Sequence, residues 1–566
     1  MDQSIQHAFQ LHQAGEVDQA IQLYLDLLDS LPHHFELLQL LGIAHGQKKS
    51  FELSLKYLKE ALALEPKNHG LLSNIGNVYK GLGEYEKALD FYHQALAICP
   101  SLSSALNNLG SMYYQQGEHT LALSYFERAH QVNENALDPI FNMALCQQGQ
   151  KSFKAAKNNY QIVKKRDGQY PDIDYHLAQC HIHLKEYHEA IDILSDLVDQ
   201  NCDHFDIRHQ LGCAYLGIED TKTALEHFDV AYTLEPFNTE NCHNIAVIHF
   251  HNGDLESALQ HWFQIITKDN QHVDALYNIG VCYQYLARFD DAKNFFNQLL
   301  SIEPNHFNTI FNMGTLYLKQ GNQKEAIRYY KHAQQLQPNH AEINFLLAAL
   351  ENKTDSYDEC PEEYVKNLFN QYAASYDDHL TKALKYKGHD VLQNIIEVHL
   401  EPKINQWDNI LDFGCGTGMA GERLKPWSKQ LIGLDCSENM LQVAKKLNIY
   451  DQLICENIYT YLPDQSPFDI IYAADVLPYF GDIKRLFALL YDGLTTNGCF
   501  ICTVEIADHI SSFCLSPSGR FKHHIEYIKK TAIACSFNII HQSQAVIRHE
   551  QNQPTEGAIF IFQRSN

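Results

Sequence analysis

Three closely spaced glycines mark a stretch of this sequence that could bind a small ligand. The stretch reads NILDFGCGTGMAG, and its first three glycines are Gly414, Gly416 and Gly418. Residues without side chains let a ligand lie directly against the backbone of a turn between a strand and a helix. Asp412 precedes the first glycine by two residues. A carboxylate there repels phosphate and attracts a cation, so we expect a ligand that carries an ammonium group.

A second acid, Asp435, lies at the expected end of the next strand, in the segment QLIGLDCS. A carboxylate at this place can accept both hydrogen bonds of a ribose diol. A dinucleotide coenzyme would call for the spacing G-x-G-x-x-G, whereas this turn has G-x-G-x-G. An ammonium group together with a ribose describes S-adenosylmethionine better than a pyrophosphate coenzyme.

Apolar segments and helical segments alternate around these residues. The expected strands are 409–414, 430–437, 468–477 and 498–505, and a helix is expected at 437–447. Such alternation predicts a parallel sheet covered by helices on both faces, with ligand bound beyond the carboxyl ends of the strands. Ser437 is a suitable N-cap for the helix.

A repeat of thirty-four residues organises the chain before residue 340. Small residues recur at this step in two series, because two antiparallel helices approach closely only where side chains are tiny. The first series is Ala8, Gly42, Gly76, Gly110, Ala144, Ala178, Gly212, Ala246, Gly280 and Gly314, and the second runs twelve residues later from Ala20 to Ala326. A bulky residue such as Tyr92 or Phe126 follows four positions after the second series. Prolines such as Pro100 should then end the second helix.

This pattern resembles the tetratricopeptide repeat in ten consecutive copies. The resemblance implies an all-α superhelix of ten repeats over residues 1–340, then a capping helix and linker over residues 341–360. A row of asparagines recurs two positions before the first small residue, as in the groove of O-linked N-acetylglucosamine transferase. The row is Asn74, Asn108, Asn142, Asn244, Asn278 and Asn312. These carboxamides either bind the amide groups of an extended peptide or bond neighbouring repeats and helix ends.

Residues 361–566 resemble a class I S-adenosylmethionine-dependent methyltransferase, and more narrowly the bacterial methyltransferases that carry tetratricopeptide repeats. The stretches that carry the resemblance are FNQYAASYDDHL, LDFGCGTG, DIIYAADVLPYFGD, GRFKHHIEYI and IRHEQNQPTEG. The resemblance implies a Rossmann-like fold with a mostly parallel seven-stranded sheet and S-adenosylmethionine as cofactor. The cofactor contacts that it implies are Asp412, Gly414, Gly416 and Gly418 for the methionyl part, Asp435 for the ribose, Met440 and Asn457 for the adenine, and Ala474 and Asp475 near the methionyl end.

The adenine contact departs from the family pattern. The family often places an acid where this chain has Asn457, and Glu456 beside it could substitute. The reaction itself needs mainly alignment of the two reactants and exclusion of water, so no single catalytic residue is assigned. The candidate bases are Tyr479, Glu505, His509, His523 and His524 near the strand ends, and Tyr376 and Asp377 from the preceding helix. Arg520 could bind a substrate carboxylate.

The net charge and the cysteine content of the chain limit the kinds of partner and the location that we expect. The chain has 566 residues, a formal net charge of −26 and fifteen scattered cysteines. The acidic balance argues against nucleic acid and against an anionic membrane surface. We find no secretory signal and no apolar run long enough for a membrane span, which with the scattered thiols indicates a cytoplasmic protein. Cys499 and Cys502 lie three apart on an expected strand and should point to opposite faces, so no metal site is expected.

These patterns predict a cytoplasmic S-adenosylmethionine-dependent methyltransferase (EC 2.1.1.-) whose repeats recruit a protein partner or substrate through protein–protein interaction. In one alternative, the enzyme is a small-molecule O-methyltransferase that uses the repeats for assembly. In another, the chain is a non-catalytic scaffold with a domain that only binds the cofactor.

Overall fold

The computed structural model describes residues 3–200, 202–351, 353, 357–373, 376–378, 380–381, 384–404, 406–550 and 553–565. Part of the expected linker, residues 352 and 354–356, lies outside the described residues. The chain divides into two compact units, Met1–Ile248 and His249–Asn566, and each is described by itself. Within the described ranges, no helix combines the length and the apolar character that crossing a membrane requires.

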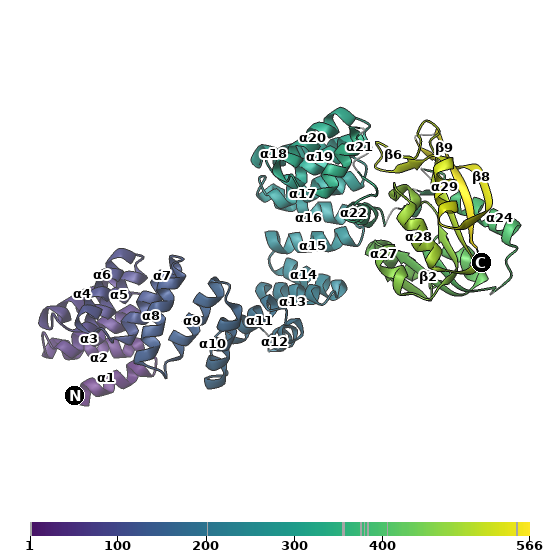
Figure 1. Ribbon diagram of the computed structural model, residues 1–566. Coiled ribbons are helices and arrows are strands. Elements are labelled where there is room, and N and C mark those ends of the chain that lie inside the picture. The colour runs from purple at the N-terminus through teal and green to yellow at the C-terminus, as the bar shows by residue number, and fades with distance from the viewer. Residues whose placement is uncertain are drawn as a thin grey trace. The chain divides into compact units, whose positions relative to one another are not determined.

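Antiparallel helix pairs build the first unit (Figure 1). The pairs are α1 (Gln3–Gln13) with α2 (Val17–Ser30), α3 (Phe35–Gln47) with α4 (Phe51–Leu64), α5 (His69–Gly81) with α6 (Tyr85–Ile98), α7 (Ser103–Gln115) with α8 (His119–Val132), α9 (Leu137–Gly149) with α10 (Phe153–Arg166), α11 (Ile173–His183) with α12 (Tyr187–Asp199), and α13 (Phe205–Gly217) with α14 (Thr221–Leu234). The next helix, α15 (Thr239–His251), spans the division between the units.

The same pairing continues in the second unit and ends in a further helix. Its helices are α16 (Leu255–Lys268), α17 (Val273–Tyr285), α18 (Phe289–Ile302), α19 (Phe307–Lys319) and α20 (Gln323–Leu336), followed by α21 (Ala341–Leu350). Prolines follow the second helix of several pairs as predicted. For example, α6 ends at Ile98 and Pro100 follows, because proline cannot continue the helical hydrogen bonds.

The small residues lie where paired helices touch, as the spacing predicts. A Cβ atom at Gly110 would lie 2.7 Å from the ring of Phe126, and one at Gly76 would lie 2.7 Å from the ring of Tyr92. Both rings are almost completely buried. The bulky residue of the second helix therefore fills the space that a side chain on the first helix would need.

The rest of the second unit is a seven-stranded sheet covered by helices. The strands are β1 (Trp407–Phe413), β2 (Ser428–Asp435), β3 (Gln452–Cys455), β4 (Phe468–Ala473), β5 (Leu494–Glu505), β8 (Phe537–Glu550) and β9 (Gln553–Arg564). Their order is β3-β2-β1-β4-β5-β9-β8, and β9 runs antiparallel to both of its neighbours while the others run parallel. The predicted mostly parallel, Rossmann-like sheet is confirmed. A separate hairpin joins β6 (Phe513–Leu515) and β7 (Phe521–His523).

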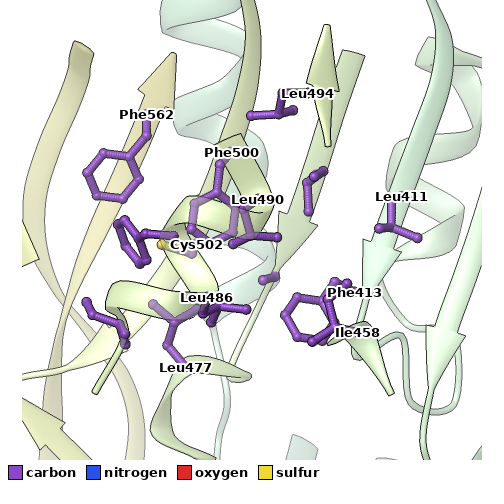
Figure 2. Close-up of a cluster of buried hydrophobic side chains, with 14 of the residues drawn as sticks. Leu411, Phe413, Ile458, Leu477, Leu486, Leu490, Leu494, Phe500, Cys502 and Phe562 are labelled. Carbon is purple, nitrogen blue, oxygen red and sulfur yellow. The ribbon is translucent and has the colours of Figure 1, made fainter. Parts of the chain in front are cut away.

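Apolar side chains leave both faces of the sheet and pack under helices. On one face, Leu411 and Phe413 of β1 and Phe500 of β5 belong to a large buried cluster (Figure 2). The covering helices on this face are α27 (Ile458–Tyr461), α28 (Lys484–Asp492) and α29 (Ile525–Ala534). The other face packs under α24 (Gly388–Leu400) and α25 (Gly421–Leu424).

Two local predictions are confirmed here. Ser437 caps α26 (Glu438–Lys446), because its side chain accepts a hydrogen bond from the backbone of Met440. Cys499 and Cys502 of β5 belong to the buried clusters on opposite faces of the sheet.

A single buried cluster joins the last helix pair to the edge of the sheet domain. It contains Tyr330 of α20, Phe345 of α21 and Phe521 of β7. Tyr364 of α22 (Glu362–Tyr372) belongs to the same cluster, and its ring centroid lies 4.9 Å from that of Phe345. The last helix pair, α21, α22 and the β6–β7 hairpin therefore share one apolar core at this junction.

Replacing Gly110 with alanine tests the packing between paired helices. The added methyl group must displace the buried ring of Phe126, which should outweigh the better helix propensity of alanine. We expect Gly110→Ala to lower stability by about 1–2 kcal/mol, measured as the midpoint of urea unfolding followed by circular dichroism. Gly168→Ala is the control, since its Cβ atom would meet nothing nearer than 3.9 Å. Equal midpoints for the two variants would contradict this account.

Candidate functional site

A cavity opens at the carboxyl ends of β1, β2 and β4, which is where open α/β sheets bind ligands. The sheet residues on its wall are Phe413, Gly414, Gly416, Leu434, Asp435, Cys436, Ala474, Asp475 and Val476. A second part of the wall comes from α22 and the segment before it, through Glu359, Cys360, Glu362, Val365 and Phe369. The remaining wall residues are Tyr376, Glu456, Asn457, Ile458, Tyr459, Tyr479 and Phe480.

The glycine turn after β1 exposes its backbone to this cavity. Gly414, Gly416 and Gly418 have φ angles of +73°, +54° and +91°, a region that residues with side chains rarely adopt. Gly414 and Gly416 are on the cavity wall. Gly418 is not among the wall residues, and a Cβ atom there would lie 3.0 Å from Leu447. The first two glycines therefore expose their backbone to the cavity, whereas Gly418 allows other residues to pack closely against the far side of the turn.

Asp435 lies beside this turn at the end of β2. Its Oδ2 accepts a hydrogen bond from the backbone of Gly416 at 2.9 Å, and its Oδ1 accepts one from the backbone of Ser437 at 2.8 Å. Burial raises the pKa of Asp435, and the backbone hydrogen bonds oppose this effect. The carboxylate is thus fixed on the wall with lone pairs left for hydroxyl donors.

Asp412 does not occupy the place that the sequence suggested. It is not among the residues that line the cavity, and the hydroxyl of Tyr450 donates a hydrogen bond to its Oδ2 at 2.6 Å. The reason is the alternation of a strand, which turns Asp412 to the face opposite Leu411 and Phe413. Burial raises the pKa of Asp412 to about 7, against the opposing hydrogen bond from Tyr450. The prediction that Asp412 contacts the ligand directly therefore lacks geometric support.

The other predicted cofactor residues divide between the wall and the interior. Ala474 and Asp475 are on the wall after β4, and Asn457 is on the wall after β3. Met440 is fully buried in the first turn of α26 and is not among the wall residues. Its expected contact with an adenine ring is therefore not supported by its position.

Asn457 is held by two hydrogen bonds. Its Oδ1 accepts from the backbone of Tyr459 at 3.0 Å and caps α27, while its Nδ2 donates to Oε2 of Glu362 at 2.8 Å. The carboxamide is therefore engaged at both of its polar atoms.

A buried network of four charges adjoins the cavity at Asp475. Arg520 donates to Oδ1 of Asp475 at 2.5 Å and to Oε1 of Glu505 at 2.6 Å. Arg548 donates to the same two oxygen atoms, at 3.1 Å and 2.6 Å. These side chains are only 2–13% exposed. Each buried charge thus has two partners of opposite sign, which such burial requires.

The network determines what the candidate bases can do. Burial would raise the pKa of Glu505, but Arg520 and Arg548 outweigh it and the pKa is lowered. Glu505 therefore stays ionised, yet it is tied to both arginines and is not on the cavity wall. Burial raises the pKa of Tyr479 and Tyr376, so both wall hydroxyls stay protonated and act as hydrogen-bond donors.

Tyr479 lies on the cavity wall, and Arg520 bonds to the wall residues Tyr479 and Asp475. The hydroxyl of Tyr479 accepts a hydrogen bond from Arg520 at 2.9 Å. The predicted binding of a substrate carboxylate by Arg520 meets competition, because Arg520 already pairs with Asp475 and Glu505.

The structure does not bring His523 to the cavity. His523 is fully buried, its Nε2 bonds to the carbonyl of Gly481 at 3.0 Å, and burial lowers its pKa to about 4. Neither His509 nor His524 is among the wall residues, and His524 caps α29 instead. The side chain of Asp377 accepts a hydrogen bond at 2.5 Å from the hydroxyl of Thr417, which is part of the glycine turn.

Sequence reasoning missed two contributors to this region. Arg548 lies in the stretch IRHEQNQPTEG that carried the resemblance, but its role depends on β8 reaching the ends of β4 and β5. Glu362 lies just after the expected linker of residues 341–360, and no pattern in the sequence assigns it a place in the cofactor site. The departure from the family pattern at Asn457 is the signal in the sequence that points to a carboxylate from elsewhere in the chain.

The asparagine row of the repeats is half-buried, and several members bond the preceding repeat. Nδ2 of Asn108 donates to Oδ1 of Asn77 at 2.7 Å, and Nδ2 of Asn142 donates to Oδ1 of Asn107 at 3.1 Å. Asn312 likewise donates to the hydroxyl of Tyr277 at 3.1 Å. These contacts match the expectation of bonds between neighbouring repeats.

Profiles of known families match both parts of the chain. The family described as tetratricopeptide repeat matches residues 11–69, 69–135 and 273–339, and the family described as methyltransferase domain matches residues 411–500. The profile of anaphase-promoting complex, cyclosome, subunit 3 matches residues 115–197. The chain therefore combines tetratricopeptide repeats with a methyltransferase domain.

Individual relatives are similar to a small part of the chain. Trans-aconitate 2-methyltransferase of Pseudomonas aeruginosa is 35% identical over 103 residues, which are 18% of this chain and 36% of that protein. Ubiquinone biosynthesis O-methyltransferase of Coxiella burnetii is 34% identical over 84 residues, 14% of this chain and 35% of that protein. The chain thus spans about a third of the length of these relatives.

Among solved structures, the N-methyltransferase NodS from Bradyrhizobium japonicum, in complex with S-adenosyl-L-homocysteine, is 14% identical with a TM-score of 0.30. That comparison covers 36% of this chain and 99% of NodS.

Asp412→Asn tests the buried carboxyl behind the glycine turn. Folding raises the pKa of Asp412, so the protonated form stabilises the fold at low pH and this contribution is lost as the pH rises through about 7. Asparagine does not ionise. We therefore expect the stability of Asp412→Asn relative to the unchanged protein to improve by on the order of 1–2 kcal/mol between pH 5 and pH 8.

The measurement is urea unfolding at several pH values, with exposed Asp464→Asn as the control. A difference between Asp412→Asn and the unchanged protein that stays constant across this range would show that Asp412 is ionised throughout.

Proposed function

We propose that the chain is an S-adenosylmethionine-dependent methyltransferase whose repeats recruit a protein partner or substrate. The observation that carries the proposal is the open glycine turn with Asp435 beside it on the wall of one cavity. The family match to a methyltransferase domain covers the same residues. S-adenosylmethionine supplies a methyl group already activated by a sulfonium.

The residues present fit this cofactor. A ribose diol needs a fixed acceptor, and Asp435 provides one whose carboxylate is held by two backbone hydrogen bonds. The methionyl part needs a backbone without side chains, which Gly414 and Gly416 provide. Ala474 and Asp475 would then border the reacting end, and the wall around Asn457 would hold the adenine.

The protein's own part in the reaction is to align the acceptor and to exclude water. Phe369 and Tyr479 pack edge to face across the cavity wall, with ring centroids 5.4 Å apart. The hydroxyl of Tyr479 accepts a hydrogen bond from Arg520, which leaves its own proton to be donated toward an acceptor oxygen. Asp475 has a φ of +61°, a left-handed conformation that is uncommon for residues other than glycine and often marks functional sites.

The acceptor class stays open between a protein and a small molecule. The names of two relatives denote methylation of trans-aconitate and of an oxygen in ubiquinone biosynthesis, which supports the alternative of a small-molecule O-methyltransferase. Loss of catalysis with retained cofactor binding would make the chain a scaffold.

We also propose a cytoplasmic location, because all fifteen cysteines lie in the described part of the chain and none forms a disulfide there.

Asp435→Ala tests the cofactor site. Loss of two charge-assisted hydrogen bonds should weaken the binding of S-adenosylhomocysteine about 100-fold, measured by calorimetry on the full chain. Asp435→Asn keeps one side-chain oxygen that can accept the hydrogen bond from the backbone of the turn, but it loses the negative charge. It therefore separates the role of Asp435 in supporting the turn from its role in binding the ribose. Asp464→Ala should bind like the unchanged protein. If the unchanged protein fails to bind both the methyl donor and its demethylated product, the proposal is wrong.

Labelling of a cell lysate with a radioactive methyl donor tests the role of the repeats. If the repeats deliver a protein substrate, label should enter the protein fraction. The double variant Asn108→Ala/Asn142→Ala should then reduce that labelling about fivefold or more, because an extended peptide would lose two acceptors. The matched control is exposed Gln94→Ala on a second helix. Label confined to small molecules, and unchanged in the double variant, would favour the small-molecule alternative.

A further inference from the structure

The cavity wall includes a carboxylate that comes from outside the sheet and its crossover helices. Glu362 is the first residue of α22, the helix that follows the segment after the capping helix α21. It lies on the wall, and its Oε2 accepts a hydrogen bond from Nδ2 of Asn457 at 2.8 Å. Asn457 follows β3, where the resemblance noted in the sequence leads us to expect an acid. Glu362 thus brings a carboxylate to the position where the sequence lacks one.

Asn457 itself is poorly placed to accept a further hydrogen bond. Its carbonyl oxygen caps α27 through the backbone of Tyr459, and its amide group is directed to Glu362. A carboxylate has about four lone-pair sites, and the bond from Asn457 uses only one of those on Glu362. Glu362 therefore keeps acceptor capacity at this end of the cavity.

Hydrogen bonds at both ends of α22 fix the position of Glu362. Before the helix, the backbone of Cys360 donates to the carbonyl of Tyr479 at 2.9 Å, and Gly481 and Asp482 both donate to the carbonyl of Asp358 at 2.7 Å. Near the end of the helix, the hydroxyl of Ser437 donates to Oδ1 of Asn370 at 2.7 Å. The helix is tied to the loop after β4 and to the start of α26, on two sides of the cavity.

We propose that Glu362 recognises the 6-amino group of the adenine in the methyl donor, in the role that an acid at position 457 would otherwise have. This inference rests on the proposed function. A 6-amino group donates hydrogen bonds and suits a carboxylate, whereas a 6-oxo purine presents an oxygen that the carboxylate repels. A residue of the helix that joins the repeats to the sheet therefore contributes to cofactor specificity.

The test compares S-adenosylhomocysteine with S-inosylhomocysteine, in which an oxygen replaces the 6-amino group. Calorimetry on the full chain should show that the unchanged protein prefers the adenosyl compound by about tenfold or more. In Glu362→Gln the side chain keeps an oxygen for Nδ2 of Asn457 and turns an NH₂ group to the purine. Affinity for the adenosyl compound should fall about tenfold, and the preference should disappear.

Glu363→Gln is the matched control, because Glu363 is exposed in the same helical turn and is not among the wall residues. It should keep both affinity and preference. Glu456→Gln tests the other acid beside Asn457. A preference that survives in Glu362→Gln but is lost in Glu456→Gln overturns the proposal and assigns the role to Glu456. Unchanged binding in Glu362→Gln refutes this inference alone, whereas an unchanged protein that binds neither compound refutes the proposed function with it.

Discussion

The candidate site depends on two parallel strands that end side by side. Phe413 of β1 pairs with Leu434 of β2, so the backbone of Gly414 donates to the carbonyl of Leu434 at 2.8 Å and the turn that follows lies against Asp435. This register places the backbone of the glycine turn beside the carboxylate of Asp435. A ligand that contains a ribose would use both groups together. A shift by a single residue would send Asp435 to the other face of the sheet and close the site. The helices, the segment before α22 and the charge network are arranged around this pairing.

The charge network has a comparable role on the other side of the cavity. Asp475 follows β4 and Glu505 is the last residue of the neighbouring strand β5, so the two acids would repel each other if they were left alone. Arg520, just before β7, and Arg548, in β8, reach both acids from segments that are remote in the chain. The balance of two positive and two negative charges makes burial tolerable and holds the side chain of Asp475 in place. Arg520 also donates a hydrogen bond to the hydroxyl of Tyr479. The charge network therefore influences both the shape of the cavity wall and the protonation of its side chains.

Local and periodic features of this protein could be predicted from its sequence, whereas contacts between distant segments could not. The step of thirty-four residues, the cap at Ser437 and the alternation of strands and helices around the glycine turn depend on neighbours in the chain or on regular spacing. Asp412 lies close to the glycines in the chain, but the alternation along β1 places it on the face opposite Leu411 and Phe413 and away from the cavity wall. The pairing of Glu362 with Asn457 joins residues ninety-five positions apart, and that of Arg548 with Asp475 joins residues seventy-three apart. Such pairs follow from tertiary packing, and nothing in the local sequence specifies them.

The buried cluster that joins Tyr330, Phe345, Tyr364 and Phe521 has a consequence for how this protein can evolve. Internal copies of a stacked array contact only their immediate neighbours, so a duplication or deletion of one copy leaves the remaining contacts intact. The final copy is different, because its helices share a core with the hairpin and with the helix that borders the cavity. Its sequence is constrained by the neighbouring domain, and recombination that changes the length of the array is expected to fall upstream of α19.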